Sequence, residues 1–265
     1  MLQDVKYYLG RCFAMKDLGE AAYILGIKIY RDRSKRLIGL CQSAYIEKIL
    51  KRFYIENSKR GSIPMQEKIK LSKSQGASTP AEVTRMQNVP YALAVGSIMY
   101  ATAVKNILKY LCNTKDMFLV YDGDIKRELR VSCYTDAGYL TDADGLKSQT
   151  GYVFVLNGDA VDWKSTKQSI FATSSAEAEY IAASDALKEA VWVRKFIAGL
   201  GITKGARHYC AKVYYLCEVI EFDDVKLEKV YTDDNLADPF TKALDFPKHS
   251  KRIANIRMLP ASNLM

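Results

Sequence analysis

The strongest constraint on the fold lies in residues 128–163, where a strand is followed by a hairpin. Residues 128–136 alternate apolar and polar side chains, as a half-buried strand does. A second strand is predicted over residues 150–156, and the Asn157-Gly158 dipeptide after it is typical of a tight hairpin turn. The return strand is predicted over residues 160–163. This half of the chain should therefore be built on a sheet that contains an antiparallel hairpin.

A long helix is predicted to follow this sheet. Ser174 or Ser175 is a suitable N-cap, and apolar side chains recur at helical spacing toward the end of the helix at Leu200. The other elements predicted in this half are a short strand over residues 170–173, a helix over 206–220, a strand over 225–231 and a last helix from Leu236.

Residues 1–111 are predicted to form a separate α+β segment. A strand over residues 21–30 returns, after a polar turn, as a strand over residues 37–41. A helix with Ser43 as its N-cap follows. The apolar stripe of this helix consists of Tyr45, Ile46, Ile49, Leu50 and Phe53. Beyond it we predict a polar loop over residues 59–80 and a helix over residues 95–111.

The net charge favours a polyanionic partner such as nucleic acid, because the 265 residues carry a formal charge of +9. Part of the excess is local, since residues 48–73 contain eight Lys or Arg and two Glu. We predict that Lys51 and Arg52 in this segment contact nucleic acid. Tyr45 and Phe53 lie on the apolar stripe and are more simply core residues than platforms for bases. A solvated surface with a basic loop is the alternative explanation.

The sequence gives no indication of secretion or membrane insertion. No secretory signal opens the chain, and the apolar run over residues 91–104 is too short to span a bilayer. The six cysteines lack the spacing of a zinc site and are predicted to be free thiols. We therefore expect an intracellular protein, cytoplasmic or nuclear, with no membrane partner.

Three carboxylates are candidates for one site. Asp136 is predicted at the end of a strand, Glu179 in the first turns of the long helix and Asp238 in the last helix. Such positions can converge over a sheet edge, and carboxylate oxygens are the ligands that Mg²⁺ prefers. Two ions held in this way hydrolyse phosphodiesters. Because the chain has 30 acidic residues, spacing alone favours the alternative, solvated surface acids.

Several motifs make the chain similar to one family. In the second half they are YTDA at 134–137, SQTGYV at 148–153, DWKS at 162–165, SSAEAEY at 174–180 and LADPFTK at 236–242. In the first half they are FAMKDLG at 13–19, LGIKI at 25–29, QSAYI at 42–46 and VGSIMY at 95–100. Residues 128–245 thereby resemble the ribonuclease H domain of copia-type retrotransposon Pol polyproteins. Residues 1–111 resemble the end of the preceding reverse transcriptase.

The resemblance implies a fold of class α/β and α+β. A ribonuclease H-like mixed sheet with flanking helices would follow a remnant of the reverse transcriptase palm and thumb. Residues 112–127 would connect the two parts, and residues 246–265 would form a C-terminal tail.

The resemblance also implies an activity, the hydrolysis of the RNA strand of an RNA–DNA hybrid. Asp136, Glu179 and Asp238 would be catalytic ligands of Mg²⁺ or Mn²⁺. Glu179 is preferred over Glu177 because its register matches the family's helix better, and Glu177 would instead stabilise the helix N-terminus.

Beside a strand turn, three polar side chains are predicted to contact a phosphate backbone, with a solvated turn as the alternative. They are Lys164, Lys167 and Gln168.

The chain also departs from the family. Residues 190–217 contain no Asp or Glu, and the resemblance implies that a central strand with the fourth catalytic carboxylate is deleted near residues 200–201. A second join lies near residues 100–102. We therefore predict weak or no nuclease activity. We also predict no polymerase activity, because the chain begins after the point where the family's polymerase Asp-Asp motif would lie, and Asp233-Asp234 belongs instead to the ribonuclease H part. Two alternatives stay open: Asp233 or Asp234 replaces the lost ligand, or the chain is a non-catalytic, basic nucleic-acid-binding remnant.

Overall fold

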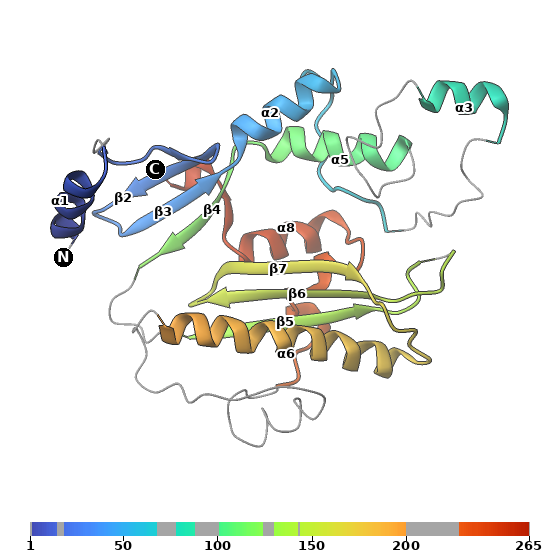
Figure 1. Ribbon diagram of the computed structural model, residues 1–265. Coiled ribbons are helices and arrows are strands. Elements are labelled where there is room, and N and C mark those ends of the chain that lie inside the picture. The colour runs from blue at the N-terminus through green and yellow to red at the C-terminus, as the bar shows by residue number, and fades with distance from the viewer. Residues whose placement is uncertain are drawn as a thin grey trace.

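A computed structural model describes residues 2–14, 19–67, 78–87, 101–123, 130–142, 144–199 and 228–264. It contains two antiparallel sheets (Figure 1). The larger sheet has the order β1-β2-β3-β4-β8 and the smaller has the order β5-β6-β7. The larger sheet consists of β1 (Tyr23–Ile24), β2 (Ile27–Asp32), β3 (Leu37–Cys41), β4 (Met117–Asp122) and β8 (Met258–Pro260). The smaller consists of β5 (Val131–Gly138), β6 (Gln149–Leu156) and β7 (Asp159–Lys167).

The helices lie outside these sheets. The α-helices among the described residues are α1 (Leu2–Cys12), α2 (Ser43–Arg52), α3 (Pro80–Gln87), α5 (Ala101–Thr114), α6 (Ser175–Gly199) and α8 (Phe246–Asn255). Three short 3₁₀ turns follow in the last part of the chain: η2 (Thr232–Asp234), η3 (Asp238–Phe240) and η4 (Ala261–Asn263). Among the described helices, none is both long enough and apolar enough to cross a membrane.

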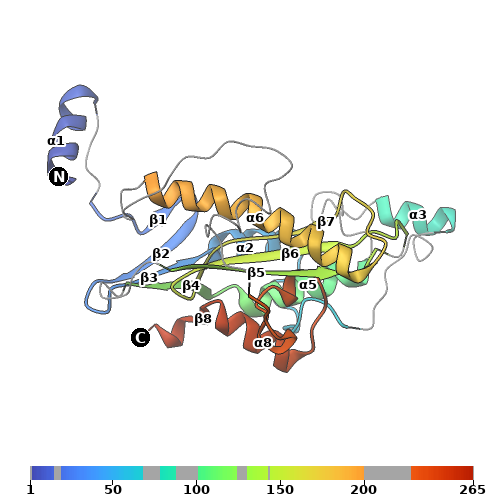
Figure 2. The same ribbon diagram turned by 90° about the horizontal axis from the view of Figure 1, so that it is seen from below.

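The smaller sheet is covered on both faces, by α6 on one and by α8 on the other (Figure 2). On β6, Tyr152 and Phe154 point toward α6, where they pack against Ala186 and Val193. The intervening residues of β6 point to the opposite face, where Val153 packs with residues of the C-terminal segment. Alternate burial on two faces explains why β6 reads as an almost continuous apolar run.

The predicted hairpin is confirmed. Asn157 and Gly158 have φ angles of 54° and 102°, the positive values that a tight hairpin turn requires. The return strand β7 extends four residues beyond the predicted 160–163, as far as Lys167. The short strand predicted over residues 170–173 is wrong, because the chain turns irregularly there and Thr173 bonds to the start of α6.

Other predictions need correction in the first half. The strand predicted over residues 21–30 is broken into β1 and β2, because Leu25 and Gly26 adopt φ angles of 51° and 80° and form a turn. Tyr45 is 60% exposed and is not a core residue. The rest of the stripe is confirmed, since Leu50 packs against Leu108 of α5.

The last helix predicted from Leu236 is also wrong. The chain makes only the turn η3 there, and α8 begins later, at Phe246. Asp245 is its N-cap residue, and the Asp245 carboxylate accepts a hydrogen bond from the backbone amide of Lys248. Residues 228–231 of the predicted strand are irregular, and the helix predicted over 206–220 lies outside the described residues. The thiols of Cys12, Cys41, Cys112 and Cys133 are free, as predicted; Cys210 and Cys217 lie outside the described residues.

The C-terminal segment connects the two sheets. Strand β8 pairs with β4 of the larger sheet, and residues just before it pack under the smaller one. Tyr121 of β4 also donates a hydrogen bond of 2.9 Å to the carbonyl of Ala160 in β7. The residues expected to form a tail are thus packed between the two halves of the molecule. The domain boundaries themselves stay a prediction.

Candidate functional site

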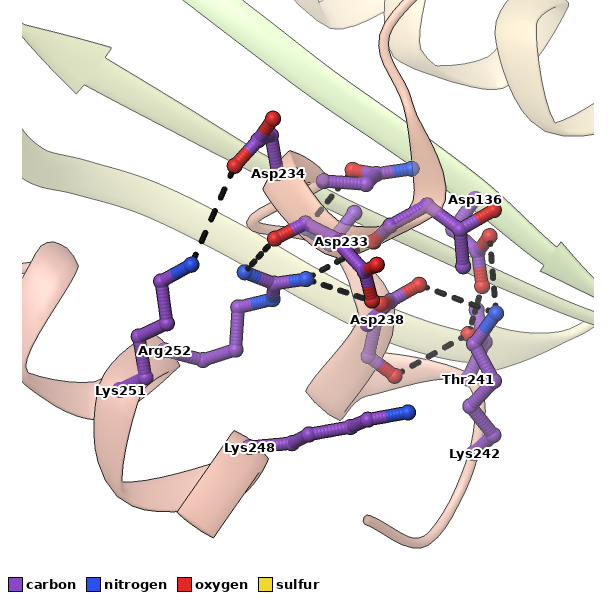
Figure 3. Close-up of polar contacts among 12 residues, drawn as sticks. Asp136, Asp233, Asp234, Asp238, Thr241, Lys242, Lys248, Lys251 and Arg252 are labelled. Carbon is purple, nitrogen blue, oxygen red and sulfur yellow. Dashed lines mark hydrogen bonds and ion pairs between the residues drawn. The ribbon is translucent and has the colours of Figure 1, made fainter.

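Asp136 and Asp238 meet beneath the smaller sheet, although about one hundred residues separate them (Figure 3). Asp136 lies in β5 and Asp238 begins η3; both are buried. The ammonium of Lys242 lies 2.9 Å from Asp238 Oδ1 and 3.5 Å from Asp136 Oδ1. The hydroxyl of Thr241 donates to Asp136 Oδ2. The two carboxylates therefore share a lysine.

A glycine allows this meeting. Gly151 of β6 lies opposite Asp136 in the strand register. A Cβ at this position would lie 2.6 Å from Thr241 Cγ2 and 2.8 Å from Phe240 Cβ. Only a residue without a side chain lets η3 pack this closely on the strand. The close approach brings Thr241 and Lys242 over the carboxylate of Asp136.

Arg252 of α8 holds the other side of the site. Its guanidinium donates to the carbonyl of Asp233 at 2.6 Å and to that of Thr232 at 2.8 Å. It also lies 3.4 Å from Asp238 Oδ2. This arginine thus ties α8 to η2 and to the carboxylate. The buried face of α8 includes His249 and Arg252, an i, i+3 spacing that a helical reading of this segment predicts.

Glu179 approaches the same site from α6. The backbone amide of Ala137 donates to its carboxylate. The pKa of Glu179 is raised, first because the carboxylate loses hydration against the protein and second because Asp136 repels its charge. Although the residue as a whole is exposed, its carboxylate therefore interacts electrostatically with that of Asp136. All three sequence-predicted carboxylates lie in one region.

The protonation equilibria reflect this crowding. Burial raises the pKa of Asp136 even though Thr241 and Lys242 favour its charged form. Burial alone would lower the pKa of Lys242, but the pKa is raised because Asp238 and Asp136 stabilise the ammonium. The lysine is thus held in its charged form between them.

Glu177 has a different role from Glu179. Its amide donates to Ser174 Oγ at 3.1 Å, and its carboxylate accepts bonds from the amide and hydroxyl of Thr173 at 2.7 and 2.6 Å. This arrangement caps the first turn of α6, as expected for a helix N-terminus. Ser174 is therefore the cap residue. The hydrogen bonds from Thr173 hold the pKa of Glu177 below its usual range.

Glu177→Gln is expected to lose a pH-dependent part of the stability. Since the pKa of Glu177 is lowered by folding, its contribution is present above its unfolded pKa and disappears as the pH falls through the folded value. Urea unfolding of both proteins between about pH 7 and about pH 3 should show their difference shrinking. In a Thr173→Val background, which lacks one donor, the difference should be smaller throughout. A difference that does not change with pH contradicts the capping role.

The described arrangement does not fit a bound divalent ion. Among the described residues, no three His, Cys, Asp or Glu side chains lie close enough together to hold a metal. The oxygens of Asp136 and Asp238 instead face Lys242, Thr241 and Arg252.

No contact joins the carboxylates proposed as replacement ligands, Asp233 and Asp234, to Asp136 or Asp238 among the described residues. Asp234 pairs with Lys251 at 4.0 Å, and the contact of Asp233 with Arg252 is made by its carbonyl (Figure 3). Both residues are exposed.

Not all predicted nucleic-acid contacts are accessible. Lys51 and Arg52 are exposed at the end of α2, and Lys164 is exposed on β7. Lys167, also exposed, pairs with Asp142. The prediction that Gln168 contacts nucleic acid is wrong, because its side chain is buried.

The amide of Gln168 donates to Thr150 Oγ1 at 3.1 Å and to the carbonyl of Ala178 at 2.9 Å. This side chain joins β6 to α6. It cannot reach a phosphate from the interior.

The fold and the site together define a class: a protein of mixed α and β structure with a buried pair of aspartates. Comparison with known proteins supplies the family: the chain belongs to the Pol polyproteins of copia-type retrotransposons. No model of a protein family and no solved structure matches it.

The relatives are mostly much longer than this chain. The retrovirus-related Pol polyprotein from transposon TNT 1-94 of Nicotiana tabacum is 33% identical over 92% of the chain and 22% of its own length. That from transposon RE2 of Arabidopsis thaliana is 25% identical over 96% of the chain and 20% of its own length. Secreted RxLR effector protein 161 of Plasmopara viticola is 35% identical over 41% of the chain and 94% of its own length. The chain spans about a fifth of the length of these two Pol polyproteins.

Proposed function

We propose that residues 128–245 form a ribonuclease H-like unit that binds an RNA–DNA hybrid without cutting it. The observation that carries the proposal is the convergence of Asp136, Glu179 and Asp238 from a strand, a helix and a later turn. This is the arrangement that the resemblance to the family implies. Residues 1–111 would be a remnant of the reverse transcriptase without polymerase activity.

The loss of catalysis is inferred from the number of carboxylates. A two-metal nuclease surrounds its ions with several acidic oxygens. Here residues 190–217 supply no carboxylate, and the acidic groups that do converge are partly neutralised by basic side chains. Mg²⁺ or Mn²⁺ remains the proposed cofactor of the ancestral site only.

Binding is supported by charge. The net charge of +9 favours a nucleic acid, and exposed lysines and arginines such as Lys51, Arg52 and Lys164 can contact its phosphates. Retrotransposon nucleic acids occur inside cells, so the proposed place of action is the cytoplasm or the nucleus. A hybrid is the partner we favour, and other nucleic acids are alternatives.

The test is cleavage and binding of a labelled RNA–DNA hybrid by the purified chain in Mg²⁺ and in Mn²⁺. We expect no cleavage, and binding that weakens as salt is raised. Asp136→Asn should behave in the same way as the unchanged protein. Metal-dependent cutting that Asp136→Asn abolishes contradicts the proposed loss of activity. Absence of salt-sensitive binding contradicts the proposed binding function.

A further inference from the structure

The acidic pair is already supplied with positive charge by the protein itself. Lys242 lies 2.9 Å from Asp238 Oδ1 and 3.5 Å from Asp136 Oδ1, and Arg252 lies 3.4 Å from Asp238 Oδ2. Thr241 donates to the remaining oxygen of Asp136 (Figure 3). Two carboxylates are thus balanced by two cations.

One oxygen of the pair depends on Lys242. Asp238 Oδ1 is buried, and the Lys242 ammonium lies 2.9 Å from it. This contact helps to raise the pKa of Lys242, as a charge-assisted hydrogen bond does. The ammonium therefore lies where a metal cation would have to meet this oxygen.

The two cations differ in how firmly they are held. The Arg252 side chain is 3% exposed and donates to two backbone carbonyls as well as facing Asp238. The Lys242 side chain is 39% exposed and makes its ion pairs with the two aspartates alone among the described residues. Lys242 is therefore the group that could leave, and the one whose removal would free both aspartates.

We propose that Lys242 acts as a tethered cation, which occupies the space between Asp136 and Asp238 and closes it to divalent metal ions. The inference rests on the proposed function, since it takes this pair as the remnant of the nuclease site. A divalent ion has to displace the ammonium before it can reach both aspartates.

The test measures metal binding directly, by the loss of the free Mn²⁺ paramagnetic resonance signal when Mn²⁺ is added to the full chain. We expect Lys242→Met to bind Mn²⁺ at least about tenfold more tightly than the unchanged protein, a change of the size seen when groups around a metal are altered. Adding Asp136→Asn to this variant should abolish the gain.

Lys248→Met is the matched control. Like Lys242→Met, it removes one positive charge, in this case from α8. The Lys248 ammonium, however, makes no ion pair with either aspartate (Figure 3). Its Mn²⁺ affinity should equal that of the unchanged protein. Equal affinities of Lys242→Met and the unchanged protein, with both folded, would overturn the proposal. So would an equal gain in Lys248→Met, because general charge would then explain it.

A second measurement covers the case in which Lys242→Met does not fold. A ligand that binds only the folded state raises the melting temperature. The unchanged protein should melt at the same temperature in Mn²⁺ and in EDTA. A rise in Mn²⁺ that Asp136→Asn abolishes would overturn the tethered-cation proposal. Hybrid cleavage, measured separately, would instead overturn the proposed function.

Discussion

Arg252→Ala is expected to lower the free energy of unfolding by about 3–5 kcal/mol, the usual cost of removing one partner from a buried ion pair. The substitution leaves the carbonyls of Thr232 and Asp233 without their donor and Asp238 without one of its two cations. The buried carboxylate of Asp238 accounts for most of this cost, because a buried charge that loses a partner is destabilising. Urea unfolding followed by circular dichroism measures the change.

The neighbouring Lys251→Ala is the control. It removes the same charge from the same helix, but Lys251 is exposed and its ion pair with Asp234 spans 4.0 Å. Exposed pairs contribute about 0–1 kcal/mol, so this variant should unfold nearly like the original. Equal losses in the two variants would show that Arg252 acts only through net charge.

Phe154→Ala should destabilise the protein by about 3–5 kcal/mol as well, because it leaves a cavity beneath α6. Phe154 is 1% exposed and packs with Ala186 and Val193 of that helix. Its ring also meets the ring of Tyr152 edge to face, with centroids 5.6 Å apart. The expected loss combines transfer of the ring to water with lost packing.

Phe171→Ala, half exposed on the irregular segment before α6, is the matched substitution. Its effect should stay below about 1 kcal/mol, as for most surface changes. A small loss at Phe154 would mean that α6 does not pack on the sheet as described.

The sequence predicted elements best where local chemistry decides them. The hairpin at Asn157-Gly158 and the start of α6, with Ser174 or Ser175 as its cap, were predictable, because turn and cap geometry depend on residues a few positions apart. The break at Leu25-Gly26 was missed, since the apolar residues on either side read as one strand. The segment over 170–173 has strand-like residues, but among the described residues no strand pairs with it.

The candidate site likewise has a part that the sequence predicted and a part that it did not. Asp136, Glu179 and Asp238 could be selected from the sequence by their motifs and by the acidic side chains that metal chemistry requires. Their surroundings could not be selected. Gln168, predicted as a phosphate contact, is instead buried between β6 and α6, because strand β7 continues past its predicted end and carries the glutamine inward.

The sequence by itself determined the hairpin, the helices with clear stripes and the identity of the acidic residues, because periodicity and turn chemistry act over a few residues. Only the tertiary structure decided that Lys242 and Arg252 would neutralise those acids. Asp136 and Lys242 are 106 positions apart, and Gly151 lets them meet by admitting η3 against β6. Contacts of this range arise from packing, which no local pattern encodes.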